Sequence, residues 1–94
     1  MTAYMITEVL QIRDSQLMAE YREAAAPLIA RHGGRFLARS EPCAKLEGDW
    51  ARVAIVSFPD MAAAQHFYNS PEYTLLRQKR ERAADARIIV IEGR

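Results

Sequence analysis

The sequence predicts an α+β domain of the ferredoxin-like kind, in which the order β-α-β-β-α-(α)-β forms a four-stranded antiparallel sheet with its helices on one face. Three observations lead to this prediction. Apolar runs typical of strands occur at 3–10, 35–47, 52–58 and 87–92. Apolar residues at three- and four-residue spacing occur at 14–32 and 60–70. Ser70 and Pro71 then start a further helix, and 94 residues make one domain, 1–94.

The first strand, 3–10, has two faces that are both largely apolar. Its alternating members are Tyr4, Ile6, Glu8 and Leu10 on one face and Ala3, Met5, Thr7 and Val9 on the other. Such a strand needs cover on both sides, and a chain of this length has helices enough for only one.

The first helix has Asp14 as its predicted N-cap and ends at Gly33 and Gly34, one of which we expect in the left-handed conformation. Its apolar stripe faces the sheet, and its charged side chains are expected to point outward. The stripe comprises Leu17, Met18, Tyr21, Ala25, Leu28 and Ile29, and the outward set comprises Glu20, Arg22 and Glu23.

The second and third strands follow. In 35–40 the alternation predicts an apolar face made by Phe36 and Ala38, and an opposite, cationic face made by Arg35, Leu37 and Arg39. We expect a bulge or bend at 40–42, a resumed strand at 44–47 and a turn at 48–49. The run 52–58 is apolar on both faces, which is typical of a central strand.

The last third of the chain turns a corner between two helices. Asp60 is the predicted N-cap of the first of them, and the Ser70-Pro71 pair ends it and starts the next, which is expected to run to about Ala84. A closing strand at 87–92 has an unbroken apolar centre.

The face of the sheet away from the helices is expected to be apolar and to include Met5 and Leu37. A monomer rarely exposes a large apolar area, whereas a second sheet packed there would bury it. The sequence therefore predicts a homodimer with its sheets face to face.

Several segments together resemble the DUF1330 family over essentially the whole chain. They are Gly33-Gly34-Arg35-Phe36-Leu37-Ala38-Arg39, Leu46-Glu47-Gly48-Asp49-Trp50, Phe67-Tyr68-Asn69-Ser70-Pro71-Glu72-Tyr73, Arg80 with Ala83-Ala84-Asp85-Ala86-Arg87, and Glu92-Gly93. The resemblance implies a ferredoxin-like subunit of a dimeric α/β barrel, and it brings no reaction because the family is a domain of unknown function. One departure is Ser40-Glu41-Pro42, where the family usually has a Gly-Gly pair after Arg39.

Composition excludes several classes of function. The net charge is +1, from 13 basic and 12 acidic residues, so no global field favours nucleic acid. No segment approaches the roughly 20 apolar residues of a membrane span, and the first residues read as a strand rather than a signal peptide, so we expect a cytoplasmic protein. Cys43 is the single cysteine, and no metal-ligand spacing is present; we expect no disulfide, metal or cofactor.

Two sets of polar residues are candidates for ligand binding. Arg35 and Arg39 share a predicted strand face, and they would hold a carboxylate or phosphate, or else pair internally with Glu8, Glu47 or Asp85. The second set lies on the helical corner and its return to the last strand: Tyr68, Ser70, Tyr73, Arg80 and Asp85. Its alternative role is structural, with Ser70 as a cap and Arg80 paired to Asp85.

His32, at the end of a helix, is the candidate general base, and Trp50 is a candidate lid of a cavity. Two hypotheses follow. In one, each subunit binds a small acidic or aromatic metabolite and acts on it without a cofactor. In the other, the protein is a non-enzymatic dimeric module, structural or stress-related, whose polar cluster is an ion-pair network. The arginines and tyrosines favour the first.

Overall fold

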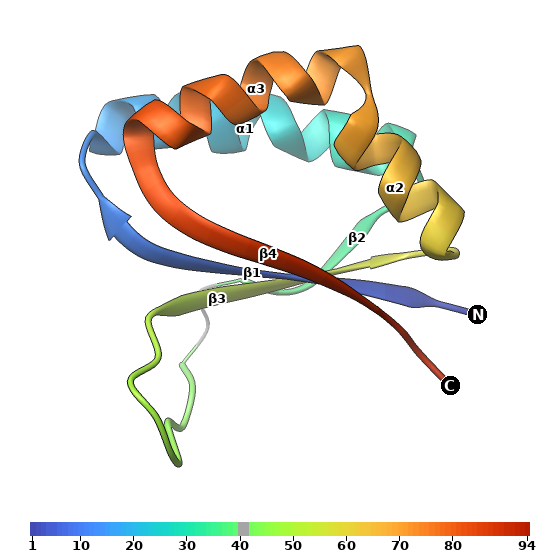
Figure 1. Ribbon diagram of the computed structural model, residues 1–94, viewed down its shortest axis with the longest axis horizontal. Helices are drawn as coiled ribbons and strands as arrows, with labels where there is room; N and C mark the ends of the chain where they lie inside the picture. The colour runs from blue at the N-terminus through green and yellow to red at the C-terminus, as the bar shows by residue number, and fades with distance from the viewer. Residues whose placement is uncertain (40–41) are drawn as a thin grey trace.

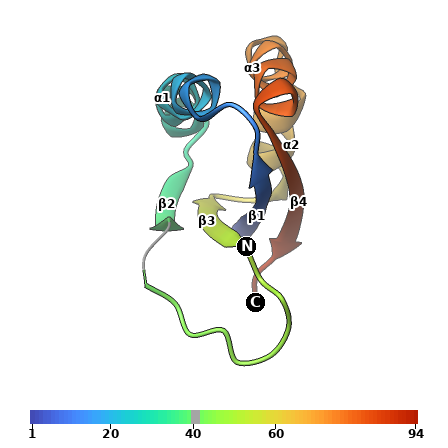
Figure 2. The same cartoon turned by 90° about the vertical axis from the view of Figure 1, so that its left-hand side faces the viewer.

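The computed structural model describes residues 1–39 and 42–94. Along the chain it has β1 (Ala3–Ile12), α1 (Ser15–Arg31), β2 (Arg35–Arg39), β3 (Arg52–Phe58), α2 (Met61–Asn69), α3 (Pro71–Ala83) and β4 (Ala84–Glu92). The strands form one antiparallel sheet in the order β2-β3-β1-β4. All three helices lie on one face of it (Figures 1 and 2). The predicted fold class is confirmed.

The predicted helix boundaries rest on local hydrogen bonds. The Asp14 and Asp60 side chains each accept a hydrogen bond from the backbone N–H three residues on, at 3.0 and 2.8 Å. Ser70 does the same at 3.1 Å for α3, whose first residue is Pro71. Gly33 ends α1 with a φ of 81°, a value that residues with side chains rarely adopt. These four boundaries confirm the predicted signals.

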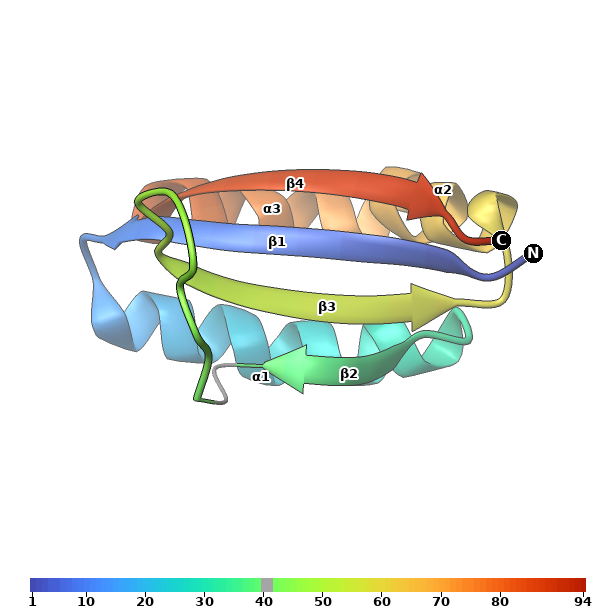
Figure 3. The same ribbon diagram turned by 90° about the horizontal axis from the view of Figure 1, so that it is seen from below.

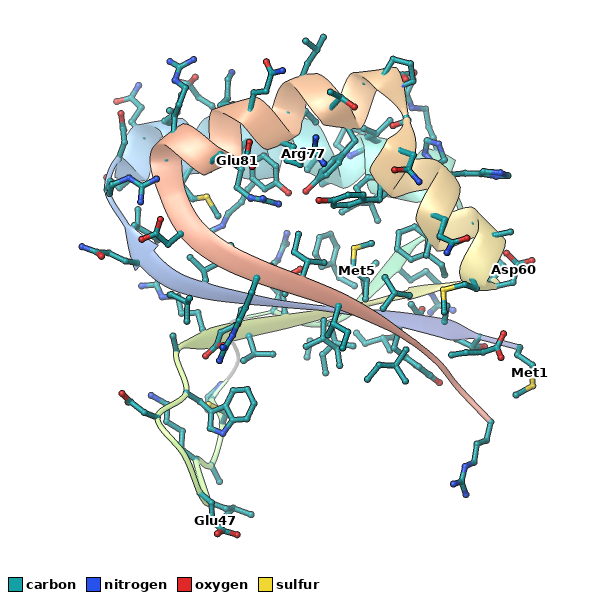
Figure 4. The ribbon with its side chains drawn as sticks, viewed as in Figure 1. Met1, Met5, Glu47, Asp60, Arg77 and Glu81 are labelled. Carbon is teal, nitrogen blue, oxygen red and sulfur yellow. The ribbon has the colours of Figure 1, made fainter. Side chains whose placement is uncertain are left out.

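The core lies between the helices and one face of the sheet. Its largest fully buried side chains are Tyr73, Phe58, Phe67 and Leu28. Met5 is 5% exposed and points into this layer (Figure 4), so its predicted place on the uncovered face was wrong. The first strand is apolar on both faces, and an alternating pattern alone does not indicate which face the helices cover.

The opposite face of the sheet, which we call the open face, carries no helix (Figure 3). The register places Ile6, Ile55 and Ile89 side by side on it, and Ile89 is 56% exposed. Residues 42–51 form a loop that extends away from the open face, with Glu47 near its far end (Figure 4). The structure thus shows the uncovered apolar surface that the sequence predicts.

The second strand differs from its prediction. Its register on β3 shifts between Phe36 and Ala38, which indicates a bulge. As a result Arg35 lies opposite Ser57 on the open face, whereas Arg39 lies opposite Ala54 on the helix-covered face. The expectation that both arginines share a face was wrong, because one extra residue reverses the alternation.

The segment after β2 is also different. Residues 44–47, expected to resume the strand, belong to a loop without regular structure. The bulge or bend expected at 40–42 falls mainly on residues outside the described part of the chain. At the other end of the sheet, β4 begins at Ala84, directly after α3 and earlier than predicted.

Candidate functional site

A cavity of about 90 Å³ lies between α1 and the helix-covered face of the sheet; we call it the inner cavity. A water molecule needs roughly 10–15 Å³ of such volume, so the inner cavity holds several water-sized groups. Its wall is mostly apolar. The lining residues are Met5, Thr7, Val9, Met18, Tyr21, Arg22, Ala25, Ile29, Phe36, Arg39, Arg52, Val53, Ala54, Val56, Phe67, Tyr73 and Ile88.

Two tyrosine hydroxyls meet at the wall of the inner cavity. The hydroxyl oxygens of Tyr21 and Tyr73 lie 2.8 Å apart, and Arg80 Nη1 donates to the Tyr73 hydroxyl at 3.0 Å. Burial, with the nearby Tyr21, raises the pKa of Tyr73 well above its ordinary value of 10.0, so Tyr73 is a neutral phenol at physiological pH. Two hydroxyls that share one hydrogen bond retain one further O–H hydrogen, and this donor is available to a ligand.

Three arginines supply the charge of the inner cavity: Arg22, Arg39 and Arg52. Arg39 stacks over the Phe36 ring, with its Cζ 4.3 Å from the ring centroid. Arg39 and Arg52 lie on the same face of neighbouring strands, because Arg39 is opposite Ala54, two residues from Arg52. Among the described residues that line the inner cavity, none is acidic. The cavity is therefore electrostatically suited to an anion.

A second cavity, of about 340 Å³, opens beside β4; we call it the β4-edge cavity. Its polar lining residues are Tyr68 and Arg80, and its apolar ones are Met5, Ala86, Ile88 and Val90. Arg77 Nη1 donates to the Tyr68 hydroxyl at 3.1 Å, and the Arg77 guanidinium also lies over the Tyr68 ring. That hydrogen bond and the charge distribution of Tyr68 raise the pKa of Arg77.

The comparisons with known proteins identify the chain. The model of the family described as "Domain of unknown function (DUF1330)" matches residues 2–94. The chain belongs to the DUF1330 family. A search of the curated proteins found no match.

Solved structures show how widely the fold of this DUF1330 chain is shared. RPA0582 from Rhodopseudomonas palustris, a protein of unknown function, has a TM-score of 0.79 at 22% identity, covering 99% of this chain and 82% of its own. SnoaB from Streptomyces nogalater, a cofactor-independent oxygenase, has 0.73 at 13%, covering 99% and 93%. A dimeric ferredoxin-like protein of unknown function from Thermobifida fusca has 0.68 at 9%, covering 99% and 92%. At these identities the likeness shows the fold alone.

The structure brings some of the predicted site residues of this DUF1330 domain together. Tyr68, Tyr73 and Arg80 form one connected cluster, since the rings of Tyr68 and Tyr73 lie 5.4 Å apart and Arg80 bonds Tyr73. Arg39 and Tyr73 line the inner cavity, whereas Arg80 lines the β4-edge cavity. Ser70 caps α3 and also donates its hydroxyl hydrogen to the Phe67 carbonyl.

The remaining predicted residues lie away from both cavities. His32 follows α1, where its Nδ1 is 3.0 Å from the Leu28 carbonyl oxygen and its ring packs edge-on against Phe67. Trp50 lies in the loop before β3 and donates to the Glu47 carbonyl at 2.7 Å. Neither residue lines the inner or the β4-edge cavity.

The predicted ion pairs also have other partners. Asp85 pairs with Arg13 at 2.5 Å, so the expected Arg80–Asp85 pair was wrong. Glu8, only 4% exposed, accepts from Ala51 N at 2.9 Å and from Arg87 Nε at 2.6 Å. The backbone hydrogen bond from Ala51, with the Arg87 guanidinium, holds the pKa of Glu8 below its ordinary value. Glu8 is thus satisfied by Arg87 rather than by Arg35 or Arg39.

Sequence reasoning missed Tyr21, Arg22, Arg52 and Arg77. Tyr21 was assigned to the apolar stripe of α1, and a tyrosine in such a stripe signals a possible buried hydroxyl that needs a partner. Arg22 was expected to point outward, but it lines the inner cavity. The long side chain of arginine reaches around a helix, so helical spacing alone places its guanidinium poorly.

Neither a metal site nor a membrane span is found in the part of the chain that the structure describes. No group of three or more histidine, cysteine, aspartate or glutamate side chains there could hold a metal ion. None of the described helices has the length and apolar character needed to cross a bilayer.

Proposed function

We propose that this protein is a homodimer that binds a small acidic or aromatic molecule in the inner cavity of each subunit. The observation that carries the proposal is the charge of the cavity: among the described residues, its charged lining side chains are Arg22, Arg39 and Arg52. A guanidinium binds a carboxylate through two parallel hydrogen bonds, which gives both affinity and orientation. An apolar wall with a few polar groups is the usual lining of a small-molecule site.

The hydroxyl pair favours a ligand that carries an oxygen. Arg80 donates to Tyr73, and an oxygen that accepts from a cation becomes a better donor through its own hydrogen. The remaining O–H hydrogen of the Tyr21–Tyr73 pair would therefore donate to an enol, phenol or carboxylate oxygen. If the ligand is also turned over, this polarised hydroxyl would stabilise negative charge that develops on that oxygen, without a bound cofactor.

The homodimer is supported by the open face. Leu37, Ile89 and Ile91 are about half exposed there or beside it, and a second open face would bury them. Proteins with this fold from Bacteroides fragilis, Thermobifida fusca and Jannaschia are described as dimeric. A sheet-to-sheet dimer leaves the helix-covered face, and with it the inner cavity, within each subunit.

The test is binding of benzoate, salicylate and phenylacetate by calorimetry, with methyl NMR to locate the site. Arg39→Gln and Arg52→Gln should each weaken binding about tenfold or more, since a charged hydrogen bond contributes about 1.5–3 kcal/mol. Arg82→Gln, an exposed arginine of α3, is the matched control and should bind as the wild type does.

Methyl shifts should appear at Ala25 and Ala54, which line the inner cavity. If the Arg39 and Arg52 variants bound these acids as tightly as the wild type does, the proposal would be contradicted. Methyl shifts confined to other residues would also contradict it. If none of the three acids binds, the polar cluster is better explained as part of a non-enzymatic structural module.

A further inference from the structure

Arg80 is a buried charge whose hydrogen bonding is incomplete. It is 7% exposed, and among the described residues its one hydrogen bond is that from Nη1 to the Tyr73 hydroxyl. Its Nε is sealed from solvent and has no partner in the described part of the chain. The three ion pairs among the described residues do not include Arg80. A buried guanidinium normally requires an anion, and these residues do not supply one.

Tyr73 does not neutralise Arg80. Its phenol would have to ionise to do so, and burial favours the neutral form instead. The hydroxyl accepts one hydrogen bond and leaves the positive charge uncompensated. The described residues therefore leave the charge of Arg80 without an acidic partner.

The cavity beside Arg80 shows which anion would fit. Tyr68 accepts a hydrogen bond from Arg77, so its own hydroxyl hydrogen remains available to the β4-edge cavity that it lines. Arg80 and Tyr68 are thus two hydrogen-bond donors, and none of the cavity's lining side chains is acidic. The rest of the wall is apolar: Met5, Ala86, Ile88 and Val90.

We propose that the β4-edge cavity binds a monocarboxylate with a small apolar body, such as a short-chain or monocyclic acid. Its carboxylate would accept from Arg80 and from the Tyr68 hydroxyl, and its apolar part would pack against Ile88 and Val90. One guanidinium matches a single negative charge, whereas a phosphate dianion would lose more hydration than these donors replace. This site shares Met5 and Ile88 with the inner cavity, but its donors, Arg80 and Tyr68, line the β4-edge cavity alone. Its assignment does not depend on the proposal made for the inner cavity.

The experiment adds hexanoate or phenylacetate to the full chain. Calorimetry measures the affinity, and methyl NMR of Ala86 and Val90 locates the bound probe. These two residues line the β4-edge cavity and do not line the inner one. Arg80→Met removes the charge. Ala86→Phe fills the cavity while leaving the Arg80–Tyr73 hydrogen bond in place, so it tests the site even if the Arg80 variant fails to fold. Arg82→Gln is the control.

We expect methyl shifts at Ala86 and Val90 in the wild type. In both Arg80→Met and Ala86→Phe the affinity should be weaker by about tenfold or more. Ligand-free Arg80→Met should melt at the wild-type temperature or above, because an apolar replacement removes an uncompensated buried charge. A lower melting temperature would show that Arg80 has only a structural role. Unchanged affinity in Ala86→Phe, shifts restricted to Ala25 and Ala54, or no binding of either probe at millimolar concentration would each overturn the proposal.

Discussion

In the part of the chain that the structure describes, one charged residue is buried on each side of the sheet, and the two differ in their hydrogen bonding. Glu8 on the open face is 4% exposed, and both of its carboxylate oxygens accept hydrogen bonds, from Ala51 N and Arg87 Nε. Arg80 of α3 lies on the helix-covered side of the sheet and is 7% exposed. Among the described residues it makes one hydrogen bond, to the neutral Tyr73 hydroxyl, and its buried Nε has no partner. One charge is satisfied within the chain and the other is not.

This difference separates structure from binding. Glu8 joins β1 to β4 and to the residue that leads into β3, so its role is accounted for by the fold. Retaining an incompletely bonded guanidinium under the helices costs stability, and replacing such a charge by an apolar side chain is often neutral or stabilising. A residue whose structural role is unfavourable is a better candidate for ligand binding than one whose bonds are complete.

The largest expected effect concerns what covers the open face. Ile89, which is 56% exposed beside Ile6, would be buried in a sheet-to-sheet dimer. Ile89→Lys should weaken the dimer by about 2 kcal/mol or more, roughly 30-fold in Kd, because the charge would lose its water at the interface. Sedimentation velocity over a dilution series measures the dissociation.

Leu75→Lys is the matched control for this prediction. Leu75 is 69% exposed on α3, on the helical side of the molecule, and its replacement should leave the dimer unchanged. An Ile89 variant that associates as tightly as the wild type would show that the open face is covered by something other than a second copy.

A smaller effect is expected from Tyr73→Phe, which removes the hydrogen-bond partner that Arg80 has among the described residues and also the hydrogen bond to Tyr21. A buried donor left without its partner costs about 1–3 kcal/mol, so urea unfolding should show a loss of this size. Tyr4→Phe is the control, since no hydrogen bond of the Tyr4 hydroxyl is found among the described residues.

A double-mutant cycle isolates the Arg80–Tyr73 interaction by making Tyr73→Phe both in the wild type and in Arg80→Met. With no guanidinium left to satisfy, Tyr73→Phe should cost less there than in the wild type, by a coupling of about 0.5–3 kcal/mol. Additive effects of the two substitutions would mean that the Arg80–Tyr73 hydrogen bond contributes nothing to stability.

The sequence was sufficient for the fold because its signals are local. Asp14, Asp60 and the Ser70-Pro71 pair fix helix starts through groups within three residues of one another, and the apolar runs assign the strands. It was insufficient for the faces of β2, since the shift between Phe36 and Ala38 depends on pairing with β3.

The site was predicted only in part for the same reason. Tyr73 and Arg80 lie about two turns apart on one predicted helix, and Tyr68 comes just before the corner that starts it, so their cluster was visible in the sequence. The partner of Glu8 was not, because Arg87 is 79 residues away and meets Glu8 through the register of β1 and β4. Contacts between distant segments require the pairing of the strands, which no local pattern specifies.

The smallest effect is expected at Glu8, whose two carboxylate oxygens both accept hydrogen bonds. Glu8→Gln retains a carbonyl oxygen for Ala51 N and loses only the attraction to Arg87, whose side chain is 67% exposed and screened by water.

Because folding lowers the pKa of Glu8 from 4.5, its ionised form stabilises the protein above that pH, and this contribution is lost as the pH falls toward the folded pKa. The melting temperatures of wild type and variant should therefore differ slightly at about pH 7 and converge as the pH falls below the folded pKa of Glu8. Glu23→Gln, at an exposed position of α1, controls for the loss of one charge, and a difference that persists unchanged at low pH would show that the ionisation of Glu8 is not what stabilises the open face.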